Sequence, residues 1–352
     1  MLAGLTVVST RFLLVLAFIT TAAWISTLRR RRRRASHWRR ITSAVAAALL
    51  TLVLVADGFN SYYSYLPNVS DVVDEVVHRP PPQLEMGRAT TKAPVPTQVR
   101  GQLATLVIPD DGSGFGKTRA WVWLPPQYFS QPMARFPVVY LFHGSPGMQK
   151  DWFHGGAADV TGRFLARQDL PVIEVAPQMS RNWLDDPECV DGIHERVETH
   201  LVRDVIPAVD RSFRTIKARS GRIFGGMSAG GYCALNLGLR HRELTATILD
   251  LSGFTAPTHA GGLKTLFGRN ESALAASNTP ASYASSLEAG PQTRIWLDCG
   301  TVDRTVLHQM QSIASLLRAA GLTVQLHTRP GDHTYSVWRP ALRESLHWAL
   351  RP

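Results

Sequence analysis

A short glycine-rich stretch carries the clearest signal for chemistry in this sequence. Residues 226–230 read Gly-Met-Ser-Ala-Gly, and a helix-forming segment follows at 234–239. Glycines on both sides of Ser228 allow a tight turn from a strand into a helix, which would push the serine hydroxyl out of the sheet. The N–H of Ala229, at the start of that helix, could then face a developing oxyanion. The pattern is loose, and taken alone it fits a plain glycine turn that packs a helix on a strand equally well.

A serine nucleophile needs a base and an orienting acid, and the downstream sequence supplies both. In the α/β-hydrolase arrangement the chain order is serine, acid, histidine, each on a loop after a strand. An expected strand at 293–298 leads through a glycine to Asp303, and an expected strand at 322–328 leads to His333. We therefore expect Ser228, Asp303 and His333 to be the catalytic residues.

Two other carboxylates compete for the role of the acid. Asp298 lies within the expected strand, which makes it less able to reach a loop, and Asp332 is adjacent to His333, where we expect it to support the loop geometry. The histidines that compete for the role of the base lie in expected strands, helices or a strand-end turn: His143, His308, His327 and His347.

A second oxyanion donor is expected in the loop after the strand at 137–142. The loop reads His-Gly-Ser-Pro-Gly at 143–147, and its glycines allow backbone amides to turn inward. Pro146 has no N–H to donate. We expect the backbone N–H groups of Ser145 and Ala229 to form the oxyanion hole, although an ordinary glycine turn fits this loop alone as well.

The positive charge of the chain is a local feature. The 352 residues contain 38 Lys and Arg against 27 Asp and Glu, a formal net charge of +11. Residues 1–56 hold nine arginines and no acidic residue, which leaves 29 basic and 27 acidic residues in the remainder. A basic face for phosphates is therefore not expected, and we expect no nucleic-acid partner.

The three cysteines fit no metal-binding spacing and form no Cys-x-x-Cys pair; they are Cys189, Cys233 and Cys299. The odd count argues against a disulfide framework. One bridge could form outside the membrane, but the sequence does not say which, and we expect these residues to be small buried hydrophobes.

Two apolar segments at the N-terminus predict a transmembrane helical hairpin. Residues 12–28 and 41–56 are uncharged, and the eight arginines between them are Arg29 to Arg34, Arg39 and Arg40. A loop rich in arginine stays in the cytoplasm, so the chain after residue 57 is expected outside it. Trp38, Tyr62 and Tyr63 are placed as interfacial aromatics. In a rival interpretation the arginines are the n-region of a signal sequence whose apolar core is 41–56.

The domain organisation follows from these segments. We expect two transmembrane helices with a cytoplasmic arginine-rich loop over 1–57, a proline-rich linker over 58–101, and a catalytic domain over 102–352. The prolines prevent a continuous helix or a central strand in the linker, which should act as a stiff, extended spacer.

Strands alternating with helices after residue 102 predict an α/β fold with a mostly parallel sheet and helices on both faces. The expected strands are 103–108, 119–124, 137–142, 171–176, 222–226, 245–251, 293–298 and 322–328. The first two look like an antiparallel hairpin. The expected helices lie near 158–168, 195–209, 230–240, 305–320 and 339–349. Residues 254–290 show no obvious element, and we expect them to cover the site as a lid-like insertion.

Several of these stretches match one known family when taken together. They are Tyr140–Gly144, Glu198–Leu201, Ile206–Asp210, Phe213–Thr215, Gly226–Gly231, Leu251–Gly253 and Gly331–His333 with Trp338. They resemble the esterase D-like family of α/β hydrolases, which includes mycolyltransferases of the bacterial envelope, S-formylglutathione hydrolases, and siderophore or feruloyl esterases. The resemblance covers roughly 102–350. It implies a serine hydrolase or acyltransferase that works through an acyl-enzyme, with no metal and no organic cofactor.

The function expected from the sequence is that of a membrane-anchored, extracytoplasmic serine esterase that hydrolyses carboxylic esters through an acyl-enzyme on Ser228. Its expected location is the cell membrane, as a multi-pass protein. The substrate is an acyl ester, for which a lipid or a cell-envelope glycolipid is a candidate. The alternative is a mycolyltransferase-like acyltransferase that moves an acyl chain onto a cell-envelope sugar. A third interpretation, of a different class, is a catalytically silent binding module on a hydrolase fold.

Overall fold

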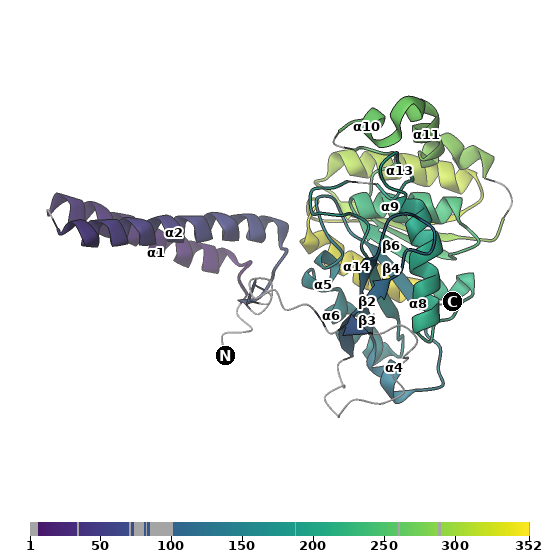
Figure 1. Cartoon of the computed structure of the whole chain (residues 1–352), viewed down its shortest axis with the longest axis horizontal. Helices are drawn as coiled ribbons and strands as arrows, with labels where there is room; N and C mark the ends of the chain where they lie inside the picture. Colours follow the sequence, from purple (N-terminus) through teal and green to yellow (C-terminus); the bar gives the residue numbers. More distant parts are fainter. Residues whose placement is uncertain are drawn as a thin grey trace. The chain divides into compact units, whose positions relative to one another are not determined.

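The chain divides into two compact units. The computed structural model describes residues 6–33, 35–69, 72–73, 81, 83–84, 101–186, 188–259, 261–287 and 290–351. One unit comprises Met1–Arg79 with Thr334–Ser336, and the other comprises Pro80–His333 with Val337–Pro352. The first unit contains the two long N-terminal helices and the second contains the sheet (Figure 1).

The first unit is a helical hairpin. Helix α1 spans Thr10–Arg32 and helix α2 spans His37–Tyr63, and both are long and apolar enough to cross a membrane by length and composition. Polar side chains join the helices: the Thr27 hydroxyl donates to the Ser43 carbonyl at 3.0 Å, and Nε1 of Trp24 donates to Oγ1 of Thr51 at 2.9 Å. Such hydrogen bonds stabilise helix pairs in a lipid environment, where apolar burial between helices contributes little.

The placement of the arginines in the hairpin corrects the sequence prediction. The prediction put all eight in a connecting loop, whereas Arg29–Arg32 form the last turn of α1, and Arg39 and Arg40 belong to the first turn of α2. Arginine is a good helix former, and cations are favourable at a helix C-terminus, so α1 continues through them. Helix α2 also runs on to Tyr63, beyond the predicted start of the linker at residue 58. Most of the remaining linker, including 85–100, lies outside the described residues.

The second unit is built on one sheet, in which the described residues form nine strands in the order β1-β2-β3-β5-β4-β6-β7-β8-β9. The strands are β1 Gln83–Leu84, β2 Gln102–Ile108, β3 Thr118–Leu124, β4 Val138–Phe142, β5 Ile173–Pro177, β6 Arg222–Met227, β7 Thr247–Leu251, β8 Arg294–Gly300 and β9 Thr323–Arg329. Strand β3 runs antiparallel to both β2 and β5, and all other pairs are parallel. The carboxyl ends of β4 to β9 therefore meet at one edge of the sheet.

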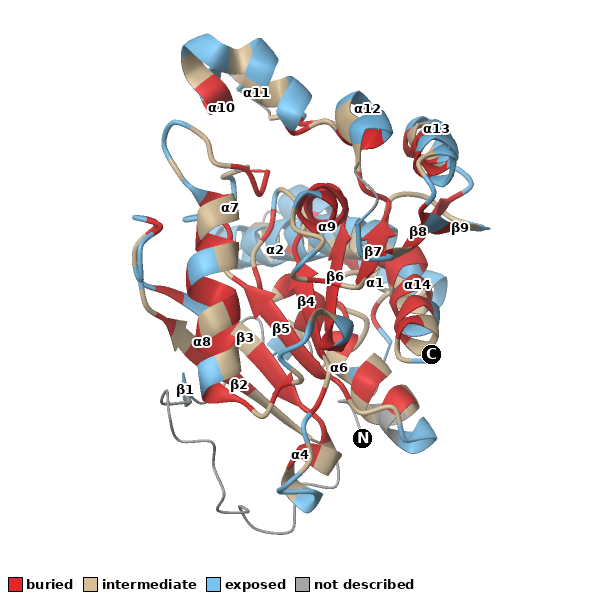
Figure 2. Cartoon of the chain, turned by 90° about the vertical axis from the view of Figure 1, so that its right-hand side faces the viewer, coloured by how far each residue is buried: buried red, intermediate tan, exposed pale blue. Residues whose placement is uncertain are grey.

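Helices cover both faces of this sheet (Figure 2). The α-helices described after β3 are α4 Pro126–Ser130, α5 Asp151–His154, α6 Ala157–Asp159, α7 Val197–Thr199, α8 Ile206–Ser212, α9 Ala229–Arg240, α10 Leu263–Phe267, α11 Glu271–Ser277, α12 Pro280–Tyr283, α13 Arg304–Ala319 and α14 Tyr335–Ala349. Helices α8, α9 and α13 lie on one face, and α6 and α14 on the other. π-Helical turns at Val160–Leu165 and His200–Val205 extend α6 and α7.

The predicted fold class is confirmed. Continuous apolar runs such as 138–142, buried at every position, form central strands because both faces of the sheet are covered. The prediction for 254–290 was wrong in one respect: this segment contains α10, α11 and α12, short helices of at most seven residues. Helices this short leave too few turns for an apolar periodicity to stand out.

A disulfide joins Cys189 to Cys233, and Cys299 is a buried free thiol. The expectation of three unpaired cysteines was therefore wrong for two of them, although all three are buried as expected. The loop after β5 brings Cys189 against α9, with 5.3 Å between the two Cα atoms and 44 positions between them in the sequence. Sequence spacing alone could not reveal this pairing.

Candidate active site

Ser228 sits at a sharp turn between β6 and α9. Its φ of 55° and ψ of −126° are an unusual conformation for a residue other than glycine. A Cβ atom at Gly226 would overlap the Gly230 carbonyl oxygen, and one at Gly230 would overlap the carbonyl oxygen of Phe142. Both positions therefore require glycine for close backbone packing. The turn follows the strand–turn–helix context expected for the nucleophile of a serine hydrolase.

The structure brings the three predicted side chains into hydrogen-bonding contact. Nε2 of His333 lies 2.9 Å from Oγ of Ser228, and Nδ1 of His333 lies 2.6 Å from Oδ2 of Asp303. Asp303 immediately precedes α13, and His333 lies on the loop between β9 and α14. The serine hydroxyl can therefore donate to Nε2 while the carboxylate accepts a hydrogen bond from the Nδ1–H group. The side chain of His333 is 30% exposed, so the base is open to a substrate.

The competing carboxylates have other partners. Asp298 is fully buried and pairs with Arg329, with 2.9 Å from Nε to Oδ1 and 2.5 Å from Nη2 to Oδ2. Asp332 accepts a hydrogen bond at 2.9 Å from the backbone N–H of His333, which is the loop-supporting role expected for it. Neither carboxylate takes the place of Asp303 beside the imidazole.

The competing histidines have other contacts than Ser228 and Asp303. His327 stacks on Trp296, with ring centroids 3.6 Å apart, and His308 and His347 lie in helices α13 and α14. His143 is buried at the end of β4, where Nδ1 is 2.8 Å from the Gly144 carbonyl and therefore donates to it. Burial lowers its pKa, so this imidazole is neutral.

Two aromatic rings flank the imidazole of His333. The ring of Trp338 meets it edge-on, with centroids 5.0 Å apart, and the ring of Phe254 stacks at 6.1 Å. Phe254 was not predicted. It directly follows the Leu251–Gly253 stretch. A bulky aromatic side chain just after a strand, at the edge of the sheet where Ser228 and His333 lie, is a signal from which a site residue could have been predicted.

The two predicted oxyanion donors line one small cavity. Gly144, Ser145 and Ala229 are among its lining residues, and its volume is about 10 Å³. A Cβ atom at Gly144 would lie 3.2 Å from Cβ of Ser228, which places this loop against the nucleophile. Ala229 is the first residue of α9, where helix geometry provides no acceptor for the backbone N–H within the helix.

An acidic wall faces the same cavity, formed by the side chains of Asp185, Asp186 and Glu188. Burial and the charge of Asp186 raise the pKa of Glu188 to about 7. Burial also raises the pKa of Asp186, an effect that the Ser145 hydroxyl and His259 oppose. Oδ1 of Asp186 is buried and has no hydrogen-bond partner among the residues that the structure describes.

A larger cavity of about 650 Å³ adjoins this wall and shares Asp185 and Asp186 with it. Its lining is mostly polar or charged: Arg181, Asn182, Asp185, Asp186, His194, Glu195, His259 and Thr265, with Leu184, Gly192, Gly261 and Leu266. Its size is within the range of small-molecule sites, about 300–1,000 Å³. Within the described ranges, no group of three or more His, Cys, Asp or Glu side chains could hold a metal ion.

The sequence analysis missed both the acidic wall and this cavity. Their residues come mainly from 178–196, between β5 and α7, and from the segment after β7. A signal was present, because a connection of this length without regular structure is usually functional in a compact domain.

The family follows from comparison with known proteins. Residues 116–349 match the sequence model of a family described as "Putative esterase". The chain belongs to the esterase family. This match covers most of the α/β unit and includes Ser228, Asp303 and His333, and the expectation of an esterase D-like hydrolase is confirmed at the level of the family.

Three relatives of this esterase are 23% to 30% identical to it in sequence. It is 30% identical over 251 residues to an uncharacterized protein of Corynebacterium glutamicum, a match that covers 69% of the chain and 59% of that protein. It is 23% identical over 231 residues to an acetyl esterase of Caldicellulosiruptor saccharolyticus, covering 60% of the chain and 82% of the relative. An esterase of Mycobacterium tuberculosis is 27% identical over 247 residues, covering 61% of the chain. The chain spans only 52% of this esterase.

Solved structures support the fold. A ferulic acid esterase superposes with a TM-score of 0.62 at 22% identity, covering 72% of this chain and 98% of its own. An S-formylglutathione hydrolase from Agrobacterium tumefaciens superposes with a TM-score of 0.57 at 17% identity, covering 72% and 95%. At these identities the likeness is one of architecture.

Proposed function

We propose that this hydrolase cleaves carboxylic esters through an acyl-enzyme on Ser228. The observation that carries the proposal is the continuous path of hydrogen-bonding contacts from Ser228 through His333 to Asp303, at 2.9 and 2.6 Å. A side chain held this way can lose its proton as it attacks, which an isolated serine at neutral pH does not do readily.

The reaction proceeds in two halves. Oγ of Ser228 attacks the ester carbonyl while Nε2 of His333 takes the hydroxyl proton, and the imidazolium is stabilised by Asp303. The backbone N–H groups of Ser145 and Ala229 bind the oxyanion. The imidazolium then gives its proton to the leaving alcohol, and the acyl-enzyme forms. Water then gives a proton to His333 as it attacks the acyl carbonyl. The bond between the acyl carbon and Oγ of Ser228 breaks, the carboxylic acid leaves, and the imidazolium returns the proton to Oγ, which restores Ser228.

The test is the variant Ser228→Ala, measured with p-nitrophenyl acetate. We expect it to retain the circular dichroism spectrum and the thermal transition of the wild type and to lose essentially all of the hydrolytic activity. Retained activity in a folded variant would refute the role of Ser228 and favour a catalytically silent module with a contaminating enzyme.

The second candidate reaction is acyl transfer to a sugar hydroxyl. The observation that favours it is that eight of the twelve residues lining the 650 Å³ cavity are polar or charged, because carboxylates, amides and imidazoles can hydrogen-bond to several hydroxyl groups of a sugar at once. Incubation with an acylated donor and a free sugar separates the two reactions. Accumulation of free acid supports hydrolysis, and accumulation of acylated sugar supports transfer.

The hairpin supports anchoring in the cell membrane with the α/β unit outside the cytoplasm. Large apolar side chains are exposed along both helices, including Phe18 at 75% and Leu52 at 66%, as expected of helices that face lipid. The arginines gather at the end of the hairpin where α1 and α2 meet. Arginine-rich ends remain in the cytoplasm, so the chain after α2 would emerge on the opposite side.

A further inference from the structure

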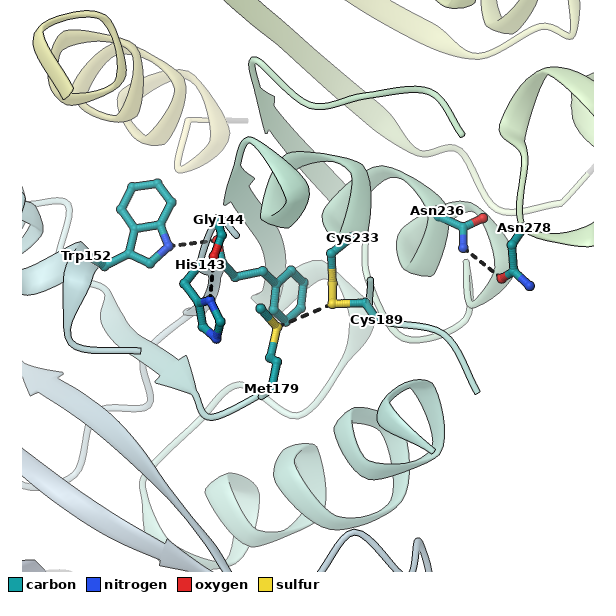
Figure 3. The surroundings of a disulfide bond; sticks show 9 residues. His143, Gly144, Trp152, Met179, Cys189, Cys233, Asn236 and Asn278 are labelled. Atoms are coloured by element: carbon teal, nitrogen blue, oxygen red, sulfur yellow. Dashed lines mark hydrogen bonds between the residues drawn. A yellow bond between two sulfur atoms is a disulfide. The ribbon is translucent and has the colours of Figure 1, made fainter. Parts of the chain in front are cut away.

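The disulfide connects the helix that follows Ser228 to the acidic wall of the small cavity. Cys233 lies in α9, in the second turn after Ser228, and Cys189 lies in the loop after β5 (Figure 3). Cys189 and its neighbour Glu188 line the small cavity beside Ala229. The sulfur of Met179 lies 3.3 Å from Sγ of Cys189, so the Met179 side chain also packs against the disulfide.

A second set of contacts, from Thr258 and His259 in the segment after β7, also holds the acidic wall. The carboxylate of Glu188 accepts hydrogen bonds from the backbone N–H of Thr258 at 2.8 and 2.7 Å and from its hydroxyl at 2.9 Å. His259 donates from Nδ1 to the Asp186 carbonyl at 2.6 Å. The acidic wall is therefore held both by hydrogen bonds to the segment after β7 and by the disulfide to helix α9.

The backbone of the wall needs such support. Glu188 and Cys189 both have φ near 53°, in the left-handed region that residues other than glycine rarely adopt. Each such residue costs about 1–3 kcal/mol and persists only where the surroundings hold it. Here the disulfide and the hydrogen bonds between Glu188 and Thr258 hold these two residues in that conformation.

The residues of the triad are held independently of the disulfide. Asp303 and His333 come from the loops after β8 and β9. The turn at Ser228 is fixed by the packing of Gly226 and Gly230 and by the hydrogen bond from its own N–H to the Leu251 carbonyl at 3.0 Å. Loss of the disulfide should therefore release the wall and leave the nucleophile in place.

We propose that the Cys189–Cys233 disulfide positions the acidic wall for substrate binding, so that substrate affinity depends on its oxidation. This inference rests on the proposed esterase function. A dithiol supplies two electrons and two protons, becomes a cyclic disulfide, and leaves thiols on Cys189 and Cys233. In the reduced state Asp186 and Glu188 lose their fixed positions, and substrate binds more weakly. An oxidising compartment outside the cytoplasm would keep the bond intact.

The experiment uses the full chain in detergent micelles and carries Cys299→Ser, so that the thiol titration counts only Cys189 and Cys233 and no third thiol can exchange with the disulfide. The values of kcat and KM for p-nitrophenyl acetate and the rate of labelling by a fluorophosphonate at saturating concentration are measured before and after treatment with dithiothreitol. We expect KM to rise about tenfold, whereas kcat and the saturating labelling rate stay within about twofold. The triple variant Cys189→Ser/Cys233→Ser/Cys299→Ser should reproduce the reduced values without a reductant.

Three results would overturn the proposal. One is an unchanged KM after complete reduction, verified by thiol titration, because the disulfide then has no part in substrate binding. Another is a fall in kcat and labelling as large as the change in KM, because the disulfide then supports the triad itself. The third is an oxidised protein that neither labels nor turns over ester, which refutes the proposed function as well and is recognised by its failure before any reductant is added.

Discussion

The carboxylate of Asp303 lies 2.6 Å from Nδ1 of His333, and Nε2 of the same ring lies 2.9 Å from Ser228. Because the carboxylate accepts a hydrogen bond from Nδ1–H, the proton of the neutral imidazole stays on Nδ1, and Nε2 presents its lone pair to the serine hydroxyl. The position of one carboxylate thus determines the tautomer that the proposed reaction requires.

Replacing Asp303 with Asn should abolish most of the activity without unfolding the protein. An amide can donate to Nδ1, which favours the wrong tautomer, and in serine hydrolases this change lowers kcat by about 10⁴-fold. The measurement is kcat for p-nitrophenyl acetate together with the thermal transition. A loss of less than about tenfold would show that Asp303 is not the orienting acid.

Asp298→Asn is the matched control, because it changes a buried carboxylate within β8, the strand that leads to Asp303. This variant breaks the pair with Arg329 and should destabilise the fold by about 3–5 kcal/mol. The kcat of the molecules that remain folded should stay close to that of the wild type. An effect on kcat as large as that of Asp303→Asn would reverse the assignment of the acid.

The turn at Ser228 makes a prediction about stability. Gly226→Ala places a Cβ atom onto the Gly230 carbonyl oxygen, which cannot move without displacing α9, so we expect a loss of about 3 kcal/mol or more. At Gly225 the nearest atoms to a Cβ lie at 3.5 and 3.6 Å, and Gly225→Ala should change stability by less than about 1 kcal/mol. Thermal unfolding of the two variants checks this, and equal transition temperatures would contradict the packing described for the turn.

Glu174 predicts a dependence of stability on pH. It is fully buried in β5, and burial raises its pKa from 4.5 to about 8, an effect that the Thr161 hydroxyl opposes. Between these values the folded state retains a proton that the unfolded chain releases, so this carboxyl lowers the free energy of unfolding as pH rises from about 4.5 to about 8.

Glu174→Gln removes this titration and should raise the transition temperature at pH 8 relative to the wild type. The difference between the two proteins should shrink towards pH 5, where the carboxyl is mostly protonated in both states. Thermal scans across this pH range measure it. A difference that is independent of pH would mean that Glu174 does not titrate as its burial implies.

The proposed topology is tested by a reporter fused after residue 69, beyond the end of α2. Alkaline phosphatase, which requires an oxidising compartment, should be active there, and a reporter fused near Arg33 should not. An inactive fusion after residue 69 beside an active fusion near Arg33 would overturn the proposed orientation of the hairpin.

The sequence revealed the parts of the fold that local pattern controls. Continuous apolar runs identified the central strands to within about two residues, because strands buried on both faces are apolar at most positions. The residues proposed as nucleophile, acid and base each follow such a strand, so their approach could be predicted from chain order. The helical arginines were missed because charge was taken to imply a loop, although arginine favours helices.

The rest of the site depends on contacts between distant segments. The pairing of Cys189 with Cys233, and of Glu188 with Thr258, follows from how the loop after β5 folds over α9, which no local pattern records. The sequence also does not reveal the short helices α10 to α12, because helices of four to seven residues are too short to show an amphipathic period.

The central claim is that Ser228 is activated by His333, and covalent labelling measures it most directly. The full chain is treated with a fluorophosphonate, digested, and analysed by mass spectrometry, beside Ser228→Ala and His333→Ala variants that retain the wild-type thermal transition. We predict that the label resides on the peptide containing Ser228, is absent from Ser228→Ala, and forms at least about 100-fold more slowly in His333→Ala. Labelling of another residue, or equal labelling rates with and without His333, would contradict the account.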